Sequence, residues 1–222
     1  MAKLILLRHG QSAWNKKNIF TGWVDIPLSL EGITEASLAG KQIADTRIDV
    51  IYTSELIRSQ MTVFLVMAEN RLGKVPCRIH SADSSLEKWY LKGSQREDLI
   101  PTHIAWQLNE RMYGDLQGKN KEEVAAEFGV DQVKLWRRSY RVAPPAGETL
   151  EDTAARAIPF FKDVIVSHLE KGENVFVCAH GNSLRAIVMH IEGLSEEAVL
   201  QLEIATGALI SYEYEQGTFC KI

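Results

Sequence analysis

Two segments of this chain place a histidine and a glycine directly after a short apolar run. Leu4-Ile5-Leu6-Leu7 leads into Arg8-His9-Gly10, and Val175-Phe176-Val177-Cys178-Ala179 leads into His180-Gly181. A continuous apolar run that ends in turn residues is typical of a strand buried on both faces. Ligands of open α/β sheets bind beyond the carboxyl ends of such strands, so parallel pairing would bring both histidines to one sheet edge. A single histidine of this kind is explained equally well by packing or exposure, whereas its repetition favours a functional site.

The remaining pattern predicts an α/β fold, a three-layer sandwich with a mostly parallel central sheet and helices on both faces. We expect strands at 49–53, 76–82 and 174–179, and a terminal hairpin of 208–214 and 218–222 that turns at Gln216-Gly217. We expect helices at 29–44, 55–71, 121–128, 131–140, 149–170 and 183–191, then a short helix capped by Ser195. The segment 13–27 is expected to be a loop, because Asn, Asp, Gly and Pro interrupt any period.

The middle of the chain, about 83–145, departs from this alternation. It is rich in Trp, Tyr, Lys, Arg, Gly and Gln, and its periodicity is weak outside the two helices expected there. A chain of 222 residues is long enough for one sizeable core and somewhat long for one domain. We therefore predict a single domain, 1–222, in which residues 83–145 form an insertion that covers the active site.

Composition limits the expected partners and cofactors. The apolar and charged fractions, 45% and 24%, are ordinary for a soluble globular protein, and no apolar stretch approaches the ~20 residues of a membrane span. A net charge of −4 argues against a nucleic-acid partner. The N-terminus does not resemble a secretory signal, so we expect a cytoplasmic location. The scattered cysteines lack the spacing of metal ligands, so we expect reduced thiols and no metal.

Arginines accompany the two histidines. Arg8 precedes His9, and Arg58 falls in the first turn of a helix just after a strand, near the same sheet edge. A metal site would require more closely spaced ligands, and the Gly-x-Ser-x-Gly elbow and the Walker loop are absent from the sequence. A neutral imidazole can act as a nucleophile toward phosphorus, and arginines bind phosphoryl oxygens. His180, at a helix N-terminus, would add a further donor. These residues predict phosphoryl transfer through a phosphohistidine.

Longer motifs resemble a known family. Arg8-His9-Gly10 with a later His180-Gly181 is the mark of the histidine phosphatase superfamily. The further motifs are Gln11 to Asn15, Phe20 to Asp25, Thr53 to Arg58, Leu108 to Arg111, Tyr113 to Gly118, Asn120-Lys121, Trp136 to Tyr140 and Asn182 to Arg185. Together and in this order they are similar to the cofactor-dependent phosphoglycerate mutases. The resemblance implies an enzyme that interconverts 3-phosphoglycerate and 2-phosphoglycerate in glycolysis and gluconeogenesis, primed by 2,3-bisphosphoglycerate and without a metal.

The resemblance also implies a role for each matching residue. His9 would carry the phosphoryl group, and Glu110 would be the general acid/base, with a proton affinity raised by nearby ligand phosphates. The residues implied to hold the transferring phosphoryl group are Arg8, Arg58, Asn15 and His180, with Gly181 and Asn182 at the helix end. Those implied to hold the carboxylate and the distal phosphate are Thr21, Gly22, Arg111, Tyr113, Lys121, Arg137 and Arg138.

Three features depart from the family pattern. Met112 stands where the family usually has histidine, and segment 83–98 looks longer than the usual connection. The chain is also short after Tyr140 and ends at Ile222 without the polar tail of longer members. With less cover over the site, we expect more access for water and more phosphatase activity. The trimmed parts leave open whether the chain forms a homo-oligomer such as a dimer.

Two other functions compete with the mutase. A sugar-phosphate or broad-specificity phosphatase of the same superfamily would use His9 in the same way but would need no distal clamp. Lys121 and the pair Arg137-Arg138 therefore favour the mutase. A non-catalytic sensor of phosphorylated ligands would have no need for His9, Glu110 and His180 together, and all three are present.

Overall fold

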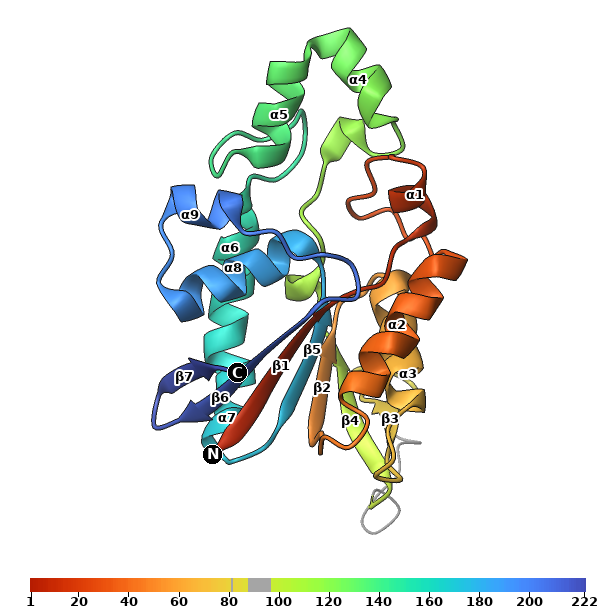
Figure 1. Cartoon of the computed structure of the whole chain (residues 1–222), viewed down its shortest axis with the longest axis vertical. Helices are drawn as coiled ribbons and strands as arrows, with labels where there is room; N and C mark the ends of the chain where they lie inside the picture. The colour runs from red at the N-terminus through yellow and green to blue at the C-terminus, as the bar shows by residue number, and fades with distance from the viewer. Residues whose placement is uncertain (81, 88–96) are drawn as a thin grey trace.

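The structure is a computed structural model that describes residues 1–80, 82–87 and 97–222, and within these residues seven strands form one central sheet (Figure 1). The strand order is β3-β4-β2-β5-β1-β6-β7. The strands are β1 (Ala2–Arg8), β2 (Val50–Thr53), β3 (Val75–Arg78), β4 (Leu99–Ile104), β5 (Val175–Ala179), β6 (Leu209–Glu215) and β7 (Thr218–Lys221). The first five in this order pair in parallel, whereas β6 and β7 are antiparallel. The prediction of a mostly parallel sheet is confirmed.

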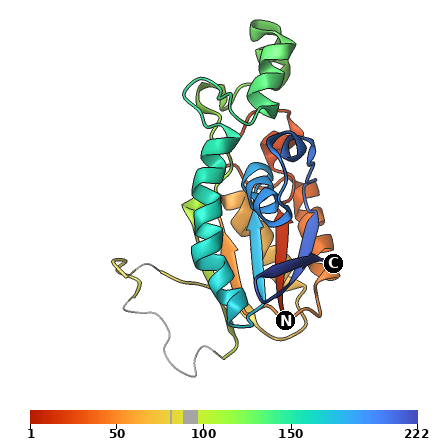
Figure 2. The same ribbon diagram turned by 90° about the vertical axis from the view of Figure 1, so that its left-hand side faces the viewer.

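Helices cover both faces of the sheet, as Figure 2 shows from the side. Helices α2 and α3 lie on one face, and α6, α7 and α8 lie on the other. The helices are α1 (Ala13–Lys16), α2 (Leu30–Gln42), α3 (Ile57–Ala68), α4 (Lys121–Phe128), α5 (Val130–Arg138), α6 (Leu150–Phe160), α7 (Val166–Glu170), α8 (Gly181–Glu192) and α9 (Glu196–Gln201). Two short 3-10 helices, Trp106–Leu108 and Gly114–Leu116, lie between β4 and α4. The predicted three-layer sandwich is confirmed.

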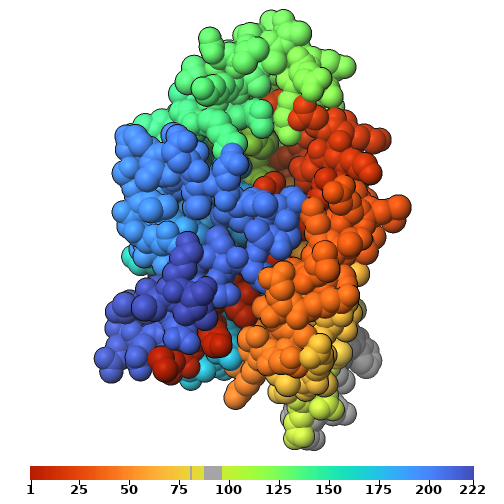
Figure 3. All heavy atoms as spheres, in the orientation of Figure 1, coloured from red at the N-terminus to blue at the C-terminus, as the bar shows by residue number. Residues whose placement is uncertain are grey.

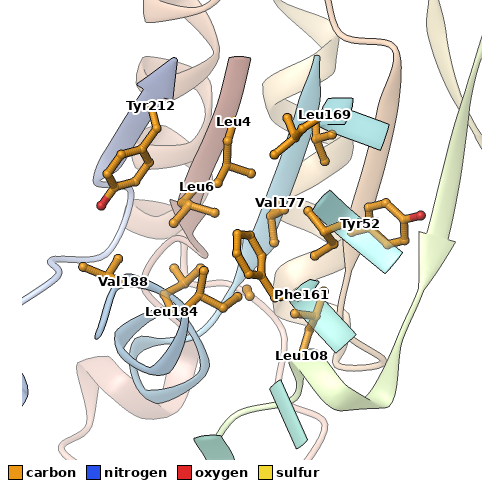
Figure 4. Close-up of a cluster of buried hydrophobic side chains, with 14 of the residues drawn as sticks. Leu4, Leu6, Tyr52, Leu108, Phe161, Leu169, Val177, Leu184, Val188 and Tyr212 are labelled. Carbon is orange, nitrogen blue, oxygen red and sulfur yellow. The ribbon is translucent and has the colours of Figure 1, made fainter. Parts of the chain in front are cut away.

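The alternation of side chains along each strand builds a separate core on each face. In β1, Leu4 and Leu6 pack toward α6, α7 and α8, where Phe161 and Leu184 meet them (Figure 4). Ile5 and Leu7 point to the opposite face and join the core beneath α2 and α3. Burial of each such side chain stabilises the fold by roughly 1.5–3 kcal/mol. The strands that carry the two histidines are therefore held from both sides.

Two elements escape the sequence prediction. Strand β4 lies between β3 and β2, inside the interval 83–145 that was interpreted as an insertion. Its sequence, Leu-Ile-Pro-Thr-His-Ile, contains a proline and two polar residues, which conceal a strand pattern. Helix α1 lies within the predicted loop 13–27, where Ser12 and Asn15 form a capping box. The predicted strand 76–82 ends earlier, at Arg78; its residue 81 lies outside the described residues.

The predicted helix 149–170 is interrupted. It begins with the expected capping box of Thr149 and Asp152, but after α6 the chain forms a π-helical turn, Phe161–Ile165, before α7. Pro159 lies just before this turn and has no N–H to donate to the helix. The loss of that hydrogen bond accounts for the change of register.

The part of the interval 83–145 after β4 extends beyond the sheet edge. Helices α4 and α5 lie at one end of the molecule and share a small core of Phe20, Leu116, Val124, Val133 and Trp136 (Figures 1 and 3). We propose that this later part, within a single domain, is the insertion that covers the active site. Of the segment 83–98, which was expected to be long, residues 88–96 lie outside the described residues.

Candidate active site

His9 and His180 lie side by side at the carboxyl edge of the sheet. Strands β1 and β5 are parallel neighbours, and Arg8 is in register with Ala179, so each histidine follows its strand at the same level. The ring centroids are 4.8 Å apart, and the exposed fractions are 2% for His9 and 0% for His180. The juxtaposition predicted from the repeated motif is confirmed.

The hydrogen bond of the His9 ring fixes its tautomer. Its Nδ1 lies 2.6 Å from the carbonyl oxygen of Gly10, which can only accept, so Nδ1 carries the proton. Nε2 then has a free lone pair. Burial, and after it the charges of Arg58 and Arg8, hold the pKa of His9 well below its usual value. The ring is therefore a neutral imidazole, ready to act as a nucleophile.

Gly10 is required because the backbone of α2 approaches it closely. A Cβ at this position would lie 2.2 Å from the carbonyl oxygen of Gly32 in α2, a distance that no side chain tolerates. The Gly10 N–H donates to Thr62 Oγ1 in α3 at 3.1 Å. The residue after His9 is thus packed tightly between two helices, which holds His9 in place.

His180 is the residue that precedes α8, as expected, and is fully buried. Its Nε2 lies 2.7 Å from Ser54 Oγ, while Nδ1 has no hydrogen-bond partner among the described residues. Burial, followed by the charges of Arg58 and His9, lowers its pKa well below the usual value.

Two arginines complete the base of the site. Arg58, in the first turn of α3, is 1% exposed and donates to the carbonyl oxygens of Gly22 at 2.7 Å and Val24 at 3.0 Å. Arg8 donates to the Ile204 carbonyl oxygen at 2.6 Å, but its buried Nε has no partner among the described residues. Burial lowers the pKa of Arg58 to about 10, against the opposing charge of Glu110, so it remains a cation at neutral pH. We call His9, His180, Arg8 and Arg58 the floor of the site.

The carboxyl group of Glu110 lies close to α8. Its Oε1 accepts from Asn182 Nδ2 at 2.8 Å, from the Asn182 N–H at 3.2 Å and from the Arg111 N–H at 2.8 Å. Burial alone would raise the pKa of Glu110, but these hydrogen bonds, with the charges of Arg8 and Arg58, hold it below the usual value. Without ligand the group is thus an ionised base. The rise expected from ligand phosphates concerns the bound state.

A cavity of about 190 Å³ lies above the floor. Nearly all the residues implied by the resemblance line it: Arg8, His9, Asn15, Thr21, Gly22, Arg58, Glu110, Tyr113, Lys121, Arg137, Arg138, Gly181 and Asn182. In Figure 3 the surface is hollowed where the segment that carries α1, the α4–α5 region and the segment after α8 meet. The two remaining candidates, His180 and Arg111, lie directly behind this lining. Arg111 donates to Tyr113 Oη at 3.0 Å and is buried, with no partner for its Nε among the described residues.

Three cations come from the helices opposite the floor; we call Lys121, Arg137 and Arg138 the roof. Burial, and after it the charge of Arg137, lower the pKa of Lys121, which begins α4. Arg138 ends α5 and pairs with Glu203 at 2.7 Å; the two side chains are 37% and 74% exposed. The cavity therefore has cations on two opposed sides, in a chain whose net charge is −4.

Three consecutive residues after α9 each hold an arginine of this cavity. The carbonyl oxygen of Leu202 accepts from Arg185 Nε at 2.7 Å, Glu203 pairs with Arg138, and the carbonyl oxygen of Ile204 accepts from Arg8. Arg185 lines the cavity but was given no role from the sequence. Its place one turn after Gly181 on α8 was the available signal, because residues four apart share a helix face.

Other sequence-based expectations were incomplete. Ser54, which contacts His180, was quoted only as part of a motif. Met112 does not line the cavity; its backbone N–H donates to Glu148 Oε2 at 2.9 Å.

In the described residues, no group of three His, Cys, Asp or Glu side chains is arranged to hold a metal ion. Over the same residues, no helix is long and apolar enough to cross a membrane.

The chain is similar to solved structures over its whole length. A Bacillus stearothermophilus protein, YhfR, superposes with a TM-score of 0.78 at 23% identity, covering 100% of this chain and 95% of that one. A mycobacterial glucosyl-3-phosphoglycerate phosphatase complexed with VO3 has a TM-score of 0.76 at 22% identity, covering 100% and 98%. At these identities the likeness establishes the fold alone.

Sequence comparison is more specific. A 2,3-bisphosphoglycerate-dependent phosphoglycerate mutase of Protochlamydia amoebophila (strain UWE25) is 54% identical over 224 residues, covering 100% of this chain and 99% of that protein. The protein of the same name from Chlamydia felis (strain Fe/C-56) is 54% identical over 219 residues, covering 99% and 96%. The family model of the histidine phosphatase superfamily (branch 1) matches residues 4–82 and 91–221. This chain belongs to the histidine phosphatase superfamily.

Proposed function

We propose that this protein is a 2,3-bisphosphoglycerate-dependent phosphoglycerate mutase, which interconverts 3-phosphoglycerate and 2-phosphoglycerate in glycolysis and gluconeogenesis. Full-length relatives of that name are 54% identical to it. The observation that carries the proposal is a buried, neutral His9 on the floor of a cavity that is lined by cations on two opposed sides. We propose a cytoplasmic location, in keeping with this metabolic role.

The cavity suits a ligand that bears several negative charges. The Nε atoms of Arg8 and Arg111 are buried and have no partner among the described residues, as expected of donors that await anionic oxygens. When bound, 2,3-bisphosphoglycerate supplies the phosphoryl group that primes His9. Floor and roof together would hold its two phosphates, and Arg111 with Tyr113 would support its carboxylate.

His9 is the nucleophile of the proposed reaction. Its Nε2 lone pair forms the N–P bond as the P–O bond to the donor's oxygen breaks, and the proton stays on Nδ1, which donates it in the hydrogen bond to the Gly10 carbonyl oxygen. Arg8 and Arg58 neutralise the charge that spreads over the phosphoryl oxygens in the transition state. His180 can donate from Nδ1 if its Nε2 accepts the Ser54 hydroxyl proton, a tautomer that the Ser54 contact permits.

Glu110 manages the proton of the substrate hydroxyl. The hydrogen bonds to its Oε1 leave Oε2 as the oxygen for that proton. As a carboxylate it takes the proton when the hydroxyl attacks phosphohistidine, and as a carboxylic acid it gives that proton to the other oxygen of the substrate when that oxygen leaves. Its lowered pKa in the free enzyme suits the first of these steps.

The roof separates a mutase from a phosphatase. Mutase chemistry requires the bisphosphorylated species to stay bound while it reorients, so that His9 recovers a phosphoryl group from the other oxygen. Lys121, Arg137 and Arg138 supply the charges for that retention, opposite the floor. A phosphatase that releases its product to water has no need for them.

The test is a coupled assay with 3-phosphoglycerate as substrate, with and without a catalytic amount of 2,3-bisphosphoglycerate. We expect formation of 2-phosphoglycerate that depends on the bisphosphate and that is faster than the release of inorganic phosphate. Rapid release of inorganic phosphate without formation of 2-phosphoglycerate would show that the protein is a phosphatase and not a mutase.

A further inference from the structure

Arg156, in α6, is hydrogen-bonded to the backbone of the segment that carries Glu110. Its Nη1 donates to the carbonyl oxygens of Gln107 at 2.8 Å and Asn109 at 2.9 Å, and its Nη2 donates to the carbonyl oxygen of Glu110 at 3.0 Å. Its side chain is 7% exposed. The guanidinium therefore satisfies a row of carbonyl groups in a segment that is neither α-helix nor strand.

Glu148 fixes Arg156 and the other end of the same segment. Its carboxylate accepts from Arg156 Nε at 3.0 Å and from Nη2 at 2.9 Å, and Oε2 also accepts the Met112 N–H at 2.9 Å. The Glu148 N–H in turn donates to the Met112 carbonyl oxygen at 2.9 Å. The pair thus holds the chain on both sides of Glu110 and Arg111.

This arrangement depends on the shape of a guanidinium. A mostly buried ion pair must recover the cost of leaving water, and it does so only when its remaining donors are satisfied. Arg156 meets this condition with its planar fork, whereas a lysine ammonium has three donors around one point and cannot reach the same carbonyls. A buried ion pair of this kind, next to the cavity lining, indicates that the position of the segment carrying Glu110 is tightly fixed.

We propose that Arg156 and Glu148 are positioning residues that set the place of the Glu110 carboxyl group relative to the substrate oxygen. The inference rests on the proposed function, because it assigns Glu110 the proton-transfer step. Arg156 and the Trp23 indole N–H hold the Glu110 carbonyl from behind, and Asn182 holds its carboxylate in front. If the rear contacts are lost, the backbone shifts and Oε2 leaves its productive position, and a 1 Å misplacement can cost about 100-fold in rate.

The test compares leaving groups in Arg156→Lys. p-Nitrophenyl phosphate releases a weakly basic phenolate and needs little help from an acid, whereas an alkyl phosphate and the mutase reaction require Glu110. We expect kcat for mutase turnover and for β-glycerol phosphate hydrolysis to fall tenfold to 100-fold. The first release of p-nitrophenolate from p-nitrophenyl phosphate, measured before water attacks the phosphohistidine, should slow no more than about threefold. Arg71→Lys, in an exposed ion pair with Asp45, is the matched control.

A second arm uses Glu110→Gln as background. Because Arg156 acts through Glu110, Arg156→Lys should lower the alkyl-phosphate rate of Glu110→Gln by less than twofold. Equal losses with both leaving groups, or independent losses in the double variant, would overturn the inference. Glu148→Gln should reproduce the pattern and answers the question if Arg156→Lys does not fold. If the wild type proves to be a phosphatase, the comparison of leaving groups still tests whether Arg156 acts through Glu110. Failure of the proposed mutase function can therefore be distinguished from failure of this inference.

Discussion

The floor and the roof of the cavity carry similar charges but are built differently. His9 and His180 are 2% and 0% exposed and follow parallel strands that are packed on both faces. The roof rests on α4, α5 and a small core of its own, and Arg138 pairs with an exposed Glu203. We therefore propose that the floor is preorganised for the reaction and that the roof retains the ligand as it turns. Chemistry and ligand retention should respond separately to substitution.

The largest effect is expected at Glu110, to which we assign the proton transfer of the chemical step above the floor. Glu110→Gln should lower mutase turnover by ~10²–10⁴-fold, the usual contribution of general acid–base catalysis. Its affinity for 3-phosphoglycerate should stay nearly unchanged, because the amide can still accept from Asn182. Steady-state rates together with calorimetric binding measure the two quantities. A large loss of affinity would place Glu110 among the binding residues.

A smaller and different effect is expected at the roof. Arg138→Ala removes a charge-assisted contact worth ~1.5–3 kcal/mol, which is about tenfold to 100-fold in the binding of 3-phosphoglycerate and 2,3-bisphosphoglycerate. Mutase turnover should fall with it, whereas hydrolysis of a simple phosphate monoester should survive far better. Arg141→Ala is the matched control, since Arg141 pairs with Glu196 but does not line the cavity. If Arg138→Ala lowers both rates by the same factor, the roof does not act in ligand retention separately from the chemical step at the floor.

The floor was predictable from the sequence to an unusual degree. Apolar runs that end in His9 and His180 specify two buried parallel strands, and Arg58 follows because a strand-to-helix turn brings it to the same edge. The sequence did not reveal two kinds of feature: short elements with an atypical local sequence, and contacts between residues far apart in the chain. Pro101 masks β4, and the Ser12–Asn15 capping box makes a helix where polar residues suggest a loop. Arg156 and Glu148 act through backbone groups far away in the chain, and no spacing in the sequence predicts such contacts.

Acid should weaken the fold through the floor. Both histidines have pKa values held well below normal, so below pH ~6.5 the unfolded chain binds more protons than the folded one. The free energy of unfolding should therefore fall as the pH drops from 7 to 5, by up to ~1.4 kcal/mol per pH unit for each buried histidine. Urea titrations across this range measure it. His180→Asn should flatten the dependence, while His80→Gln, in a different pocket, should not.

The smallest effect is expected where the roof meets Glu203. In the free protein the Glu203 carboxylate accepts a hydrogen bond from Arg138, so a ligand anion that binds Arg138 must compete with it. Exposed ion pairs of this kind are worth ~0–1 kcal/mol, so Glu203→Gln should tighten the binding of 3-phosphoglycerate by no more than about fivefold. Glu196→Gln, which releases Arg141 instead, should leave binding unchanged. Weaker binding in Glu203→Gln would show that Glu203 orients Arg138 and does not compete for it.

The central claim is that His9, on the preorganised floor, carries the phosphoryl group. It is tested most directly by the intact mass of the protein after incubation with 2,3-bisphosphoglycerate, before and after mild acid. We predict a gain of one phosphoryl group that acid removes, that maps to His9, and that persists in Arg138→Ala when the bisphosphate is saturating. An unchanged mass, or equal labelling of His9→Ala, would contradict the account.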